Sequence, residues 1–265
     1  QMAGMDKAKE RIELRFSGKV GVDMGYSTKS SYGEHKTERL LKESDRKKVL
    51  IATHCFFDSP HGYGNNLFPD FYEWLDFLGK MTLETDYDWY IKTHPDYRPG
   101  TMEIIASFLR KYPKLILLPS DSSHHQLIKE GIDVALTCYG SIGFEYAAQG
   151  ILVVNASMNN PHIAYNFNLH PKNVDEYHDV LKNIDSNSLS IDKNEVYEYY
   201  FMRHIFDSKD WLFDNYSGMM KEVGGYFELF TSKSYGVWIR ECSDKKHKRM
   251  LEKVASFVDS GSFRM

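Results

Sequence analysis

The sequence is poor in cysteine and has no long apolar run. Its three cysteines, Cys55, Cys138 and Cys242, lie far apart and form no CxxC pair, which argues against a cysteine-based zinc site or redox pair and fits a reducing compartment. Cys55 and Cys138 stand in apolar runs, where we expect small buried side chains. Because no apolar run reaches eighteen residues and no signal peptide is recognised, neither a membrane span nor secretion is predicted.

An excess of positive charge is also missing. Thirty-three Lys and Arg residues against 37 Asp and Glu residues give a formal net charge of −4. This balance argues against a dedicated nucleic-acid-binding protein. Hydrophobic residues make up 42% of the 265 residues, which is enough for a full core and argues against wholesale disorder. The many Tyr and Phe residues could hold sugars or bases, but an aromatic-rich core is the simpler interpretation.

Short apolar runs alternate with amphipathic stretches along the middle of the chain. The predicted strands are 47–55, 88–94, 114–119, 133–139 and 151–156. The predicted helices are 67–81, 101–112, 120–131, a helix opening at Ser141, and 174–184. The strands are continuously apolar rather than alternating, which is typical of a parallel sheet buried on both faces. With right-handed crossovers, the pattern predicts a doubly wound, Rossmann-like α/β fold followed by C-terminal helices.

Three regions are predicted from this pattern. Residues 1–45 are polar, contain one short candidate strand, and read as a linker or the tail of an N-terminal domain; 46–190 form the Rossmann-like domain; 191–265 form a helical extension. The opening stretch "QMAGMDKAKERIELRF" does not resemble the start of a fold, so we expect the chain to begin within a longer protein. The Lys/Arg-rich helix 244–258 either contacts an anionic membrane or partner or, more simply, presents a solvated face.

Polar side chains gather after every predicted strand. In an open parallel sheet, ligands bind where these loops meet, at the carboxyl ends of the strands. In strand order the rim carries His54, Asp58, His61, Gly62 and Gly64; Lys92, His94, Pro95 and Arg98; Ser120, Asp121, Ser122, Ser123, His124 and His125; Tyr139, Gly140, Ser141, Gly143 and Glu145; and Asn155, Ser157, Asn159, Asn160, His162 and Tyr165. A domain with a purely structural role has less reason to gather so many polar side chains at one edge of its sheet.

The stretch "CYGSIGFEYAAQG", residues 138–150, places a turn before a helix at this rim. A helix opening at Ser141 would point free N–H groups at a ligand, and phosphate is the natural guest. Gly140 and Gly143 would let the ligand approach the backbone, and Glu145 could accept hydrogen bonds from sugar hydroxyls. The alternative is a tight strand–helix turn, with Glu145 favouring the helix dipole. The stretch matches neither the dinucleotide fingerprint nor a P-loop.

The stretch "IKTHPDYRPG" fixes a histidine on a stiff loop. Pro95 follows His94, and Lys92 and Arg98 flank it, so either cation could meet a phosphate. A core histidine bonded to a loop carbonyl is the alternative for His94.

Two other chemistries fit the residues less well. The rim histidines and Asp58 could converge on a metal, but no pair has the i, i+4 spacing of a zincin and no thiolate joins them, so no metal site is predicted. A Ser–His–Asp hydrolase would need the G-x-S-x-G elbow, and the stretch "CYGSIG" lacks that spacing.

Taken together, "HCFFDSPHGYGNNLFPDFYEWL", "WYIKTHPDYRPG" and "LILLPSDSSHHQLIKEGIDVALTCYGSIGFEYAAQGILVVNAS" resemble bacterial capsule polysaccharide biosynthesis proteins of the Kdo-transferase type. A looser likeness extends to teichoic-acid glycerophosphotransferases. The resemblance covers about residues 47–175 and rests on a K/R-x-H-P strand end followed, about fifty residues on, by a Ser/Gly turn and a helix with Glu. It implies a GT-B glycosyltransferase, of which this chain is the C-terminal domain that binds the nucleotide-activated donor.

The resemblance also implies roles for rim residues. His94 would contact the donor phosphate or sugar, Glu145 would hold ribose or donor hydroxyls, and Asp58 is the internal candidate for a catalytic base, on its rim position alone. The candidate binding residues are Lys92, Pro95, Arg98, Ser120, Ser122, Ser123, His124, Tyr139, Gly140, Ser141 and Gly143. In this family the acceptor and usually the base come from the N-terminal domain, and no complete copy of it is found here. This chain alone could therefore bind donor without turning it over.

The implied reaction is direct displacement at the anomeric carbon, with His94, a helix N-terminus and nearby cations stabilising the leaving phosphate without metal or cofactor. The expected partners are a nucleotide-activated sugar and a saccharide or lipid-linked acceptor, and no nucleic acid. The expected place is the cytoplasm, either free or peripheral at the inner membrane. Three alternatives stay open: a CDP-polyol phosphotransferase, a sugar-nucleotide epimerase, and a non-catalytic binding module.

Overall fold

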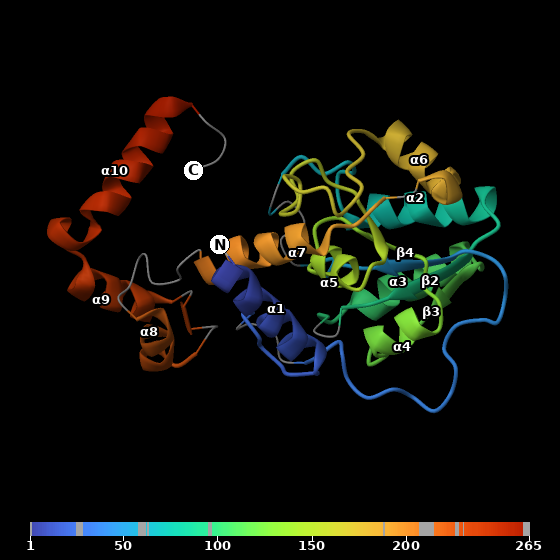
Figure 1. Ribbon diagram of the computed structural model, residues 1–265, viewed down its shortest axis with the longest axis horizontal. Helices are drawn as coiled ribbons and strands as arrows, with labels where there is room; N and C mark the ends of the chain where they lie inside the picture. The colour runs from blue at the N-terminus through green and yellow to red at the C-terminus, as the bar shows by residue number, and fades with distance from the viewer. Residues whose placement is uncertain are drawn as a thin grey trace. The chain divides into compact units, whose positions relative to one another are not determined.

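The structure is a computed structural model that describes residues 2–24, 29–57, 62, 64–94, 97–187, 189–206, 215–225, 228–229 and 231–261. The chain divides into two compact units, Gln1–Arg203 and His204–Met265. The first unit contains the sheet and the helices that flank it (Figure 1). Each unit is described by itself.

The first unit is built on a parallel sheet of five strands in the order β3-β2-β1-β4-β5. The strands are β1 (Lys48–Ala52), β2 (Asp88–Lys92), β3 (Leu115–Leu117), β4 (Val134–Thr137) and β5 (Leu152–Asn155). In register, Val49 of β1 pairs with Trp89 of β2 on one side and with Val134 of β4 on the other. Every strand lies within a predicted one, so the predicted doubly wound, Rossmann-like α/β class is confirmed.

Helices cover both faces of the sheet. They are α2 (Phe71–Glu84), α3 (Thr101–Lys111), α4 (His124–Lys129), α5 (Ile142–Ala148) and α6 (Val174–Lys182). Side chains of α2, α3 and α6 share one hydrophobic core with the sheet, and side chains of α4 and α5 share the other. In Figure 1, α2 and α6 accordingly lie on the opposite side of the sheet from α4.

The strands are apolar throughout because both of their faces are buried. In β1, Val49 and Ile51 enter the core beneath α2, whereas Leu50 between them enters the core beneath α4 and α5. This follows from the two-residue period of a strand, which turns successive side chains to opposite faces. All three are 0% exposed. Fully burying one such side chain contributes about 1.5–3 kcal/mol.

The N-terminal segment differs from its sequence-based prediction. Instead of a short strand, residues Met2–Phe16 form helix α1. Helix α7 (Lys193–Tyr200) packs against α1 and α5, so it belongs to the same unit as the sheet. Asp23 fastens the two helices, because it pairs with Arg11 of α1 at 2.8 Å and accepts from the Tyr200 hydroxyl at 2.8 Å. The predicted domain limits at 45 and 190 stay predictions, but the compact unit itself runs from α1 through α7.

The second unit contains the helices α8 (Tyr216–Val223), α9 (Ser232–Glu241) and α10 (Asp244–Ser260). Met219, Val223 and Val237 form its small core. The sequence predicted α8 and α10 but not α9. Between the units, Phe201–Phe206 form a π-helical turn that continues α7. Within the described residues, no helix combines the length and the apolar character needed to cross a membrane.

The cysteines follow their predicted environments in part. Cys138 is 3% exposed at the end of β4, as predicted, and burial raises the pKa of its thiol. Cys55 is only partly buried, and Cys242 is exposed.

Candidate functional site

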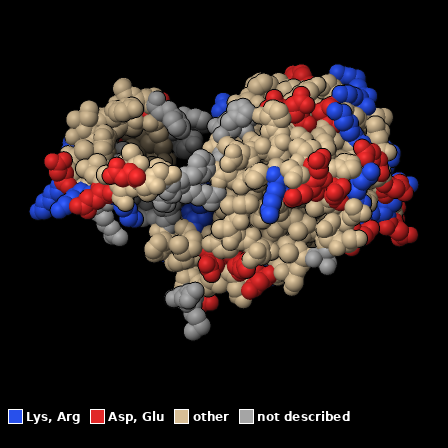
Figure 2. All heavy atoms as spheres, turned by 90° about the horizontal axis from the view of Figure 1, so that it is seen from above, with Lys and Arg blue, Asp and Glu red and all other residues tan. Residues whose placement is uncertain are grey.

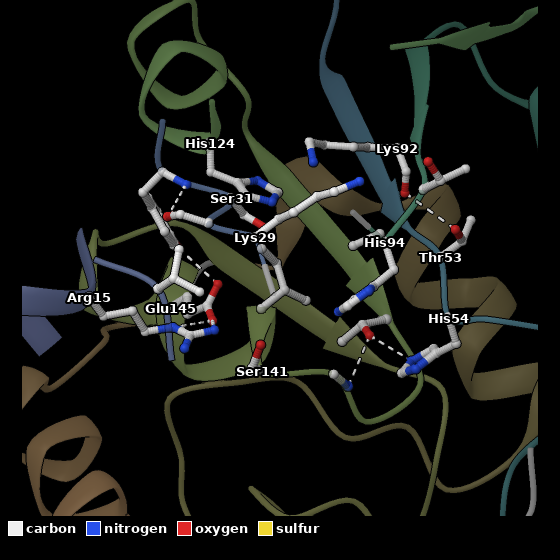
Figure 3. Close-up of a pocket in the computed structure, with 18 of the residues that line it drawn as sticks. Arg15, Lys29, Ser31, Thr53, His54, Lys92, His94, His124, Ser141 and Glu145 are labelled. Atoms are coloured by element: carbon white, nitrogen blue, oxygen red, sulfur yellow. Dashed lines mark hydrogen bonds and ion pairs between the residues drawn. The ribbon is translucent and has the colours of Figure 1, made fainter. Parts of the chain in front are cut away.

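A cavity opens at the carboxyl ends of β1, β2 and β4. The chain leaves β1 toward β2 on one side and leaves β4 toward β5 on the other, so this is the point where the winding direction reverses. The cavity and the open solvent at its mouth together span about 780 Å³. Figure 3 shows its side chains converging from several elements far apart in the sequence.

Two walls face each other across this cavity. The strand-end wall follows the strands and consists of Ala52, Thr53, His54, Lys92, Thr93, His94, His124, Thr137, Gly140, Ser141, Ile142 and Glu145. The N-terminal wall consists of Arg15, Lys19, Val20, Gly21, Lys29, Ser30, Ser31 and Tyr32.

Glu145 joins the two walls. Its side chain is 3% exposed. The Arg15 Nε donates to Oε1 at 2.8 Å, and Nη2 lies 2.6 Å from the same oxygen. The Tyr32 hydroxyl donates to the other oxygen, Oε2, at 2.9 Å. The carboxylate is therefore held from both sides by residues of the N-terminal wall (Figure 3).

The Glu145–Arg15 pair is ionised although it is buried. Burial alone would raise the pKa of the carboxyl, but the Arg15 charge and the hydroxyls of Ser141 and Tyr32 more than offset it, so the pKa of Glu145 lies below its ordinary value. Burial would lower the pKa of Arg15, but the charge and hydrogen bond of Glu145, together with the nearby Tyr32 and Tyr200, more than offset it, so the pKa of Arg15 is raised. Arg15 also lies over the Phe144 ring, 6.0 Å from its centroid. A buried charge pair of this kind is costly to break from one side.

Lys92 is a buried cation at the end of β2. Its side chain is 2% exposed, and its Nζ donates to the Ser120 carbonyl at 3.1 Å. Burial lowers the pKa of Lys92 to about 8, partly offset by the charges of Glu145 and Asp121. A lysine with a lowered pKa, whose Nζ has one carbonyl acceptor among the described residues, gains from an anion that enters the cavity, because the anion stabilises its charged form.

His54 has a structural role at the base of the cavity. Its Nε2 lies 3.0 Å from Thr137 Oγ1 and accepts from the backbone N–H groups of Cys138 and Tyr139 at 3.3 and 3.4 Å. The ring stacks on Phe71 with centroids 4.6 Å apart. Burial, aided by the nearby His94 charge, lowers the pKa of His54 to about 3, so the ring is neutral and anchors the turn after β4.

The other two histidines of the cavity differ in exposure. His124 is buried, its Nδ1 lies 2.8 Å from the Tyr146 hydroxyl, and burial holds its pKa well below the ordinary value. His94 is exposed and lies on the cavity side of the loop after β2, where Lys29 and Lys92 also point inward (Figure 3). His94 is thus the histidine that an entering ligand can reach.

The cavity is cationic. Four of its lining side chains are Lys or Arg, and Glu145 is the one carboxylate among the described lining residues. On the face of the sheet-containing unit that Figure 2 shows, basic and acidic side chains intermingle. With more cations than carboxylates in its lining, the cavity favours an anion as its ligand.

The structure brings together about half of the predicted site residues. Those that line the cavity are Lys92, His94, His124, Gly140, Ser141 and Glu145. Asp58 and Pro95 lie outside the described residues. Arg98 is exposed on the loop before α3, and Ser120 lines a separate groove with Thr93.

Four predicted residues lie behind the cavity lining. Ser122 and Ser123 are buried, and their hydroxyls have no hydrogen-bond partner among the described residues. Tyr139 packs on His54 with ring centroids 4.5 Å apart. Gly143 faces His162 rather than the cavity: a Cβ added there would lie 2.4 Å from the His162 ring. Gly143 thus lets a neighbouring loop approach the helix, whereas the prediction gave that space to a ligand.

The N-terminal wall escaped the sequence-based prediction altogether. Arg15, Lys19, Lys29 and Tyr32 lie in a polar segment without strand–helix alternation, so no rule for parallel sheets assigns them to the rim. The stretch "RIELRF", which ends at Arg15 and Phe16, alternates polar and apolar residues, and this two-residue period is typical of a strand. Its pattern therefore did not indicate the helix α1, nor that this helix ends at the cavity.

Comparisons with known proteins give only a distant likeness. No family model matches the chain, and no curated protein matches its sequence. Among solved structures, KpsC of Thermosulfurimonas dismutans, a β-Kdo 2,4 transferase, is 14% identical with a TM-score of 0.46, over 76% of this chain and 56% of that one. The wall teichoic acid polymerase TagF is 16% identical with a TM-score of 0.38, over 81% of this chain and 46% of that one. The chain thus spans about half the length of each.

Proposed function

We propose that the cavity binds the phosphate of a nucleotide-activated sugar and that the chain is the donor-binding part of a GT-B glycosyltransferase of bacterial surface polysaccharide synthesis. The observation that carries this proposal is the cationic cavity at the reversal point of a Rossmann-like sheet. Open sheets of this kind bind nucleotides at such points. The cavity's excess of cations over carboxylates selects an anion.

Two cavity residues have a defined part in the proposed reaction. Lys92 would contact the phosphate, and His94, exposed on the loop that follows Lys92, would contact the phosphate or the sugar as negative charge develops on the leaving group. An acceptor hydroxyl attacks the anomeric carbon, the bond from that carbon to the phosphate oxygen breaks, and the nucleotide leaves with the electron pair. The base that takes the acceptor proton is not assigned, and metal independence stays a prediction.

A CDP-polyol phosphotransferase would use the same cationic cavity. It would differ in the atom attacked, which would be the phosphorus nearer the polyol rather than an anomeric carbon. The donor that binds therefore separates the two reactions: a CDP-polyol favours the phosphotransferase, and a nucleotide sugar favours the glycosyltransferase.

The test is a thermal-shift panel with CMP, CDP, UDP, GDP and their sugar and polyol conjugates, with and without EDTA. A ligand that binds only the folded state at a hundred times its dissociation constant stabilises by about 2.7 kcal/mol. We expect one nucleotide series to raise the melting temperature equally with and without EDTA. No shift with any member, in this chain and in a longer chain that includes a preceding domain, would contradict the proposal.

A further inference from the structure

Glu145 has little capacity left to accept hydrogen bonds from a ligand. An ionised carboxylate offers about four acceptor positions on its two oxygens. Both Arg15 contacts lie on Oε1, at 2.8 and 2.6 Å, and the Tyr32 hydroxyl occupies Oε2 at 2.9 Å. The Ser141 hydroxyl adds a further interaction that lowers the pKa of Glu145. A ribose diol, which needs two acceptor positions, cannot bind here without displacing one of these donors.

Arg15 keeps donors to spare. Its guanidinium carries five N–H groups in a planar fork, and the contacts to Glu145 engage only Nε and Nη2. Arg15 lines the cavity with a side chain that is 15% exposed. Within the described part of the chain, the two N–H groups of Nη1 and the second N–H group of Nη2 therefore remain for a ligand. A fork of this geometry matches two oxygens of a phosphate.

We infer that Glu145 is a positioning residue, which holds Arg15 of the N-terminal wall so that the Arg15 guanidinium binds the phosphate of the ligand. Glu145 itself does not contact the ribose. This deepens the proposed function and rests on it for the nucleotide, but the Arg15 contact concerns any phosphate anion.

The charges in the cavity are compatible with a positioning role for Glu145 and a phosphate contact by Arg15. The Arg15–Glu145 pair is neutral as a whole. It therefore orients the N–H groups of Arg15 without adding net charge to the cavity. Lys92, Lys29 and Lys19 supply the excess positive charge. Replacing the Glu145 carboxylate with a neutral side chain makes the cavity more positive by one charge, but it also leaves the Arg15 side chain free to move. If charge alone mattered, Glu145→Gln would strengthen anion binding; if Arg15 must be held, it would weaken it.

The first experiment measures pyrophosphate affinity by calorimetry. We expect Glu145→Gln, Glu145→Asp and Arg15→Lys each to weaken it about tenfold, because a charged hydrogen-bonded contact of this kind is worth roughly that factor. In an Arg15→Gln background, Glu145→Gln should cause no further loss. Arg11→Gln is the matched control, since Arg11 lies one turn earlier on α1 and pairs with Asp23 outside the cavity lining. Its affinity should equal that of the parent protein.

The second experiment removes the ribose hydroxyls instead. CMP, CDP, UDP and GDP are each compared with their 2′,3′-dideoxy counterparts, in the parent protein and in Glu145→Gln. We expect the same ratio of affinities in both proteins. A direct contact predicts a ratio of about tenfold in the parent that falls to about one in the variant. Circular dichroism and melting curves establish that each variant is folded, and Glu145→Asp, which keeps the charge, replaces Glu145→Gln if that variant fails to fold.

The outcomes separate this inference from the proposed function. If pyrophosphate binding depends on Arg15 but no nucleotide binds, the Arg15 role stands and the proposed function fails. If nucleotides bind and the dideoxy ratio collapses in Glu145→Gln, the function stands and the inference is wrong. Stronger pyrophosphate binding by Glu145→Gln, or no pyrophosphate binding by the parent, also overturns the inference.

Discussion

The two walls of the cavity belong to the same chain, but they reach the cavity for different reasons: one by the topology of the sheet, the other by tertiary contacts. The strand-end wall is made of residues that end or directly follow β1, β2 and β4, or that lie in α4 and α5. The N-terminal wall is made of the end of α1 and the loops after it, more than fifteen residues ahead of the first strand. Both walls carry cations, and Glu145 of one is held by Arg15 of the other.

The difference between the walls shows what topology alone dictates. In a parallel sheet the strand ends must meet at one edge, so any side chain there is near the ligand whatever its identity. A segment outside the alternation reaches that edge only through tertiary contacts, such as the 2.9 Å bond from the Tyr32 hydroxyl to Glu145. If both walls bind the ligand, variants of each should lower affinity; if only the strand-end wall does, variants of the N-terminal wall should change stability alone.

The largest effect is expected at Lys92. Lys92→Met removes a buried cation from the strand-end wall and should weaken pyrophosphate binding about a hundredfold, measured by calorimetry. The matched control is Lys48→Met. Lys48 is also buried, at 7% exposure, and its Nζ also donates to one backbone carbonyl, that of Ser44 at 2.9 Å, but it lies at the amino end of β1. Equal losses from both variants would mean a general electrostatic effect and no specific site.

The parallel sheet with helices on both faces could be predicted because each strand carries the signal in its own short stretch of sequence. "VLIA", "WYI" and "VAL" are apolar on every residue, and only strands buried on both faces need that. Lys92, His94 and Glu145 follow from the same logic. The role of Gly143 could not be predicted in the same way, because a glycine at the start of a helix has two uses, close approach of a ligand or close packing of another loop. The position of the His162 ring, which the sequence does not give, favours the second use.

Gly143 offers the next largest effect. A Cβ at this position would lie 2.4 and 2.6 Å from atoms of the His162 ring, so Gly143→Ala should lower the free energy of unfolding by about 2 kcal/mol through overpacking. Pyrophosphate affinity should stay within about twofold of the parent. Gly33→Ala is the control, since nothing lies within 4 Å of its added Cβ, and its effect should be under about 1 kcal/mol. A large loss of pyrophosphate affinity in Gly143→Ala would instead mean that the ligand approaches the backbone at Gly143.

The pH dependence of binding should report Lys92. Its pKa in the unliganded protein is about 8, set mainly by burial against the opposing charges of Glu145 and Asp121, with buried His124 beside it. CDP keeps its phosphates ionised throughout this range. Its affinity should therefore be nearly level up to about pH 7 and fall about tenfold from pH 7 to 9, as Lys92 loses its proton.

Stability should move in the opposite direction over the same range. The pKa of Lys92 rises to its ordinary value of 10.5 on unfolding, so between pH 8 and 10.5 the unfolded chain binds more protons at this group than the folded one. The contribution of Lys92 to stability therefore increases with pH. In Lys92→Met the slope of CDP affinity should vanish, and the slope of stability should lose the part that Lys92 contributes. A slope of CDP affinity that survives in this variant would assign the pH dependence of binding to another group.

The smallest effect is expected in the N-terminal wall, and it decides whether that wall is part of the folded unit. Tyr32→Phe removes one donor from the buried Glu145 carboxylate but leaves Arg15 in place, and the ring keeps its contact with Phe16 at 4.8 Å. We expect a loss of about 1 kcal/mol in the free energy of unfolding by urea. It should be accompanied by a rise in the pKa of Glu145, because one interaction that lowers that pKa is gone. No change in stability would mean that α1 and the loops after it do not rest on the strand-end wall in solution, and the cavity would then have a single wall.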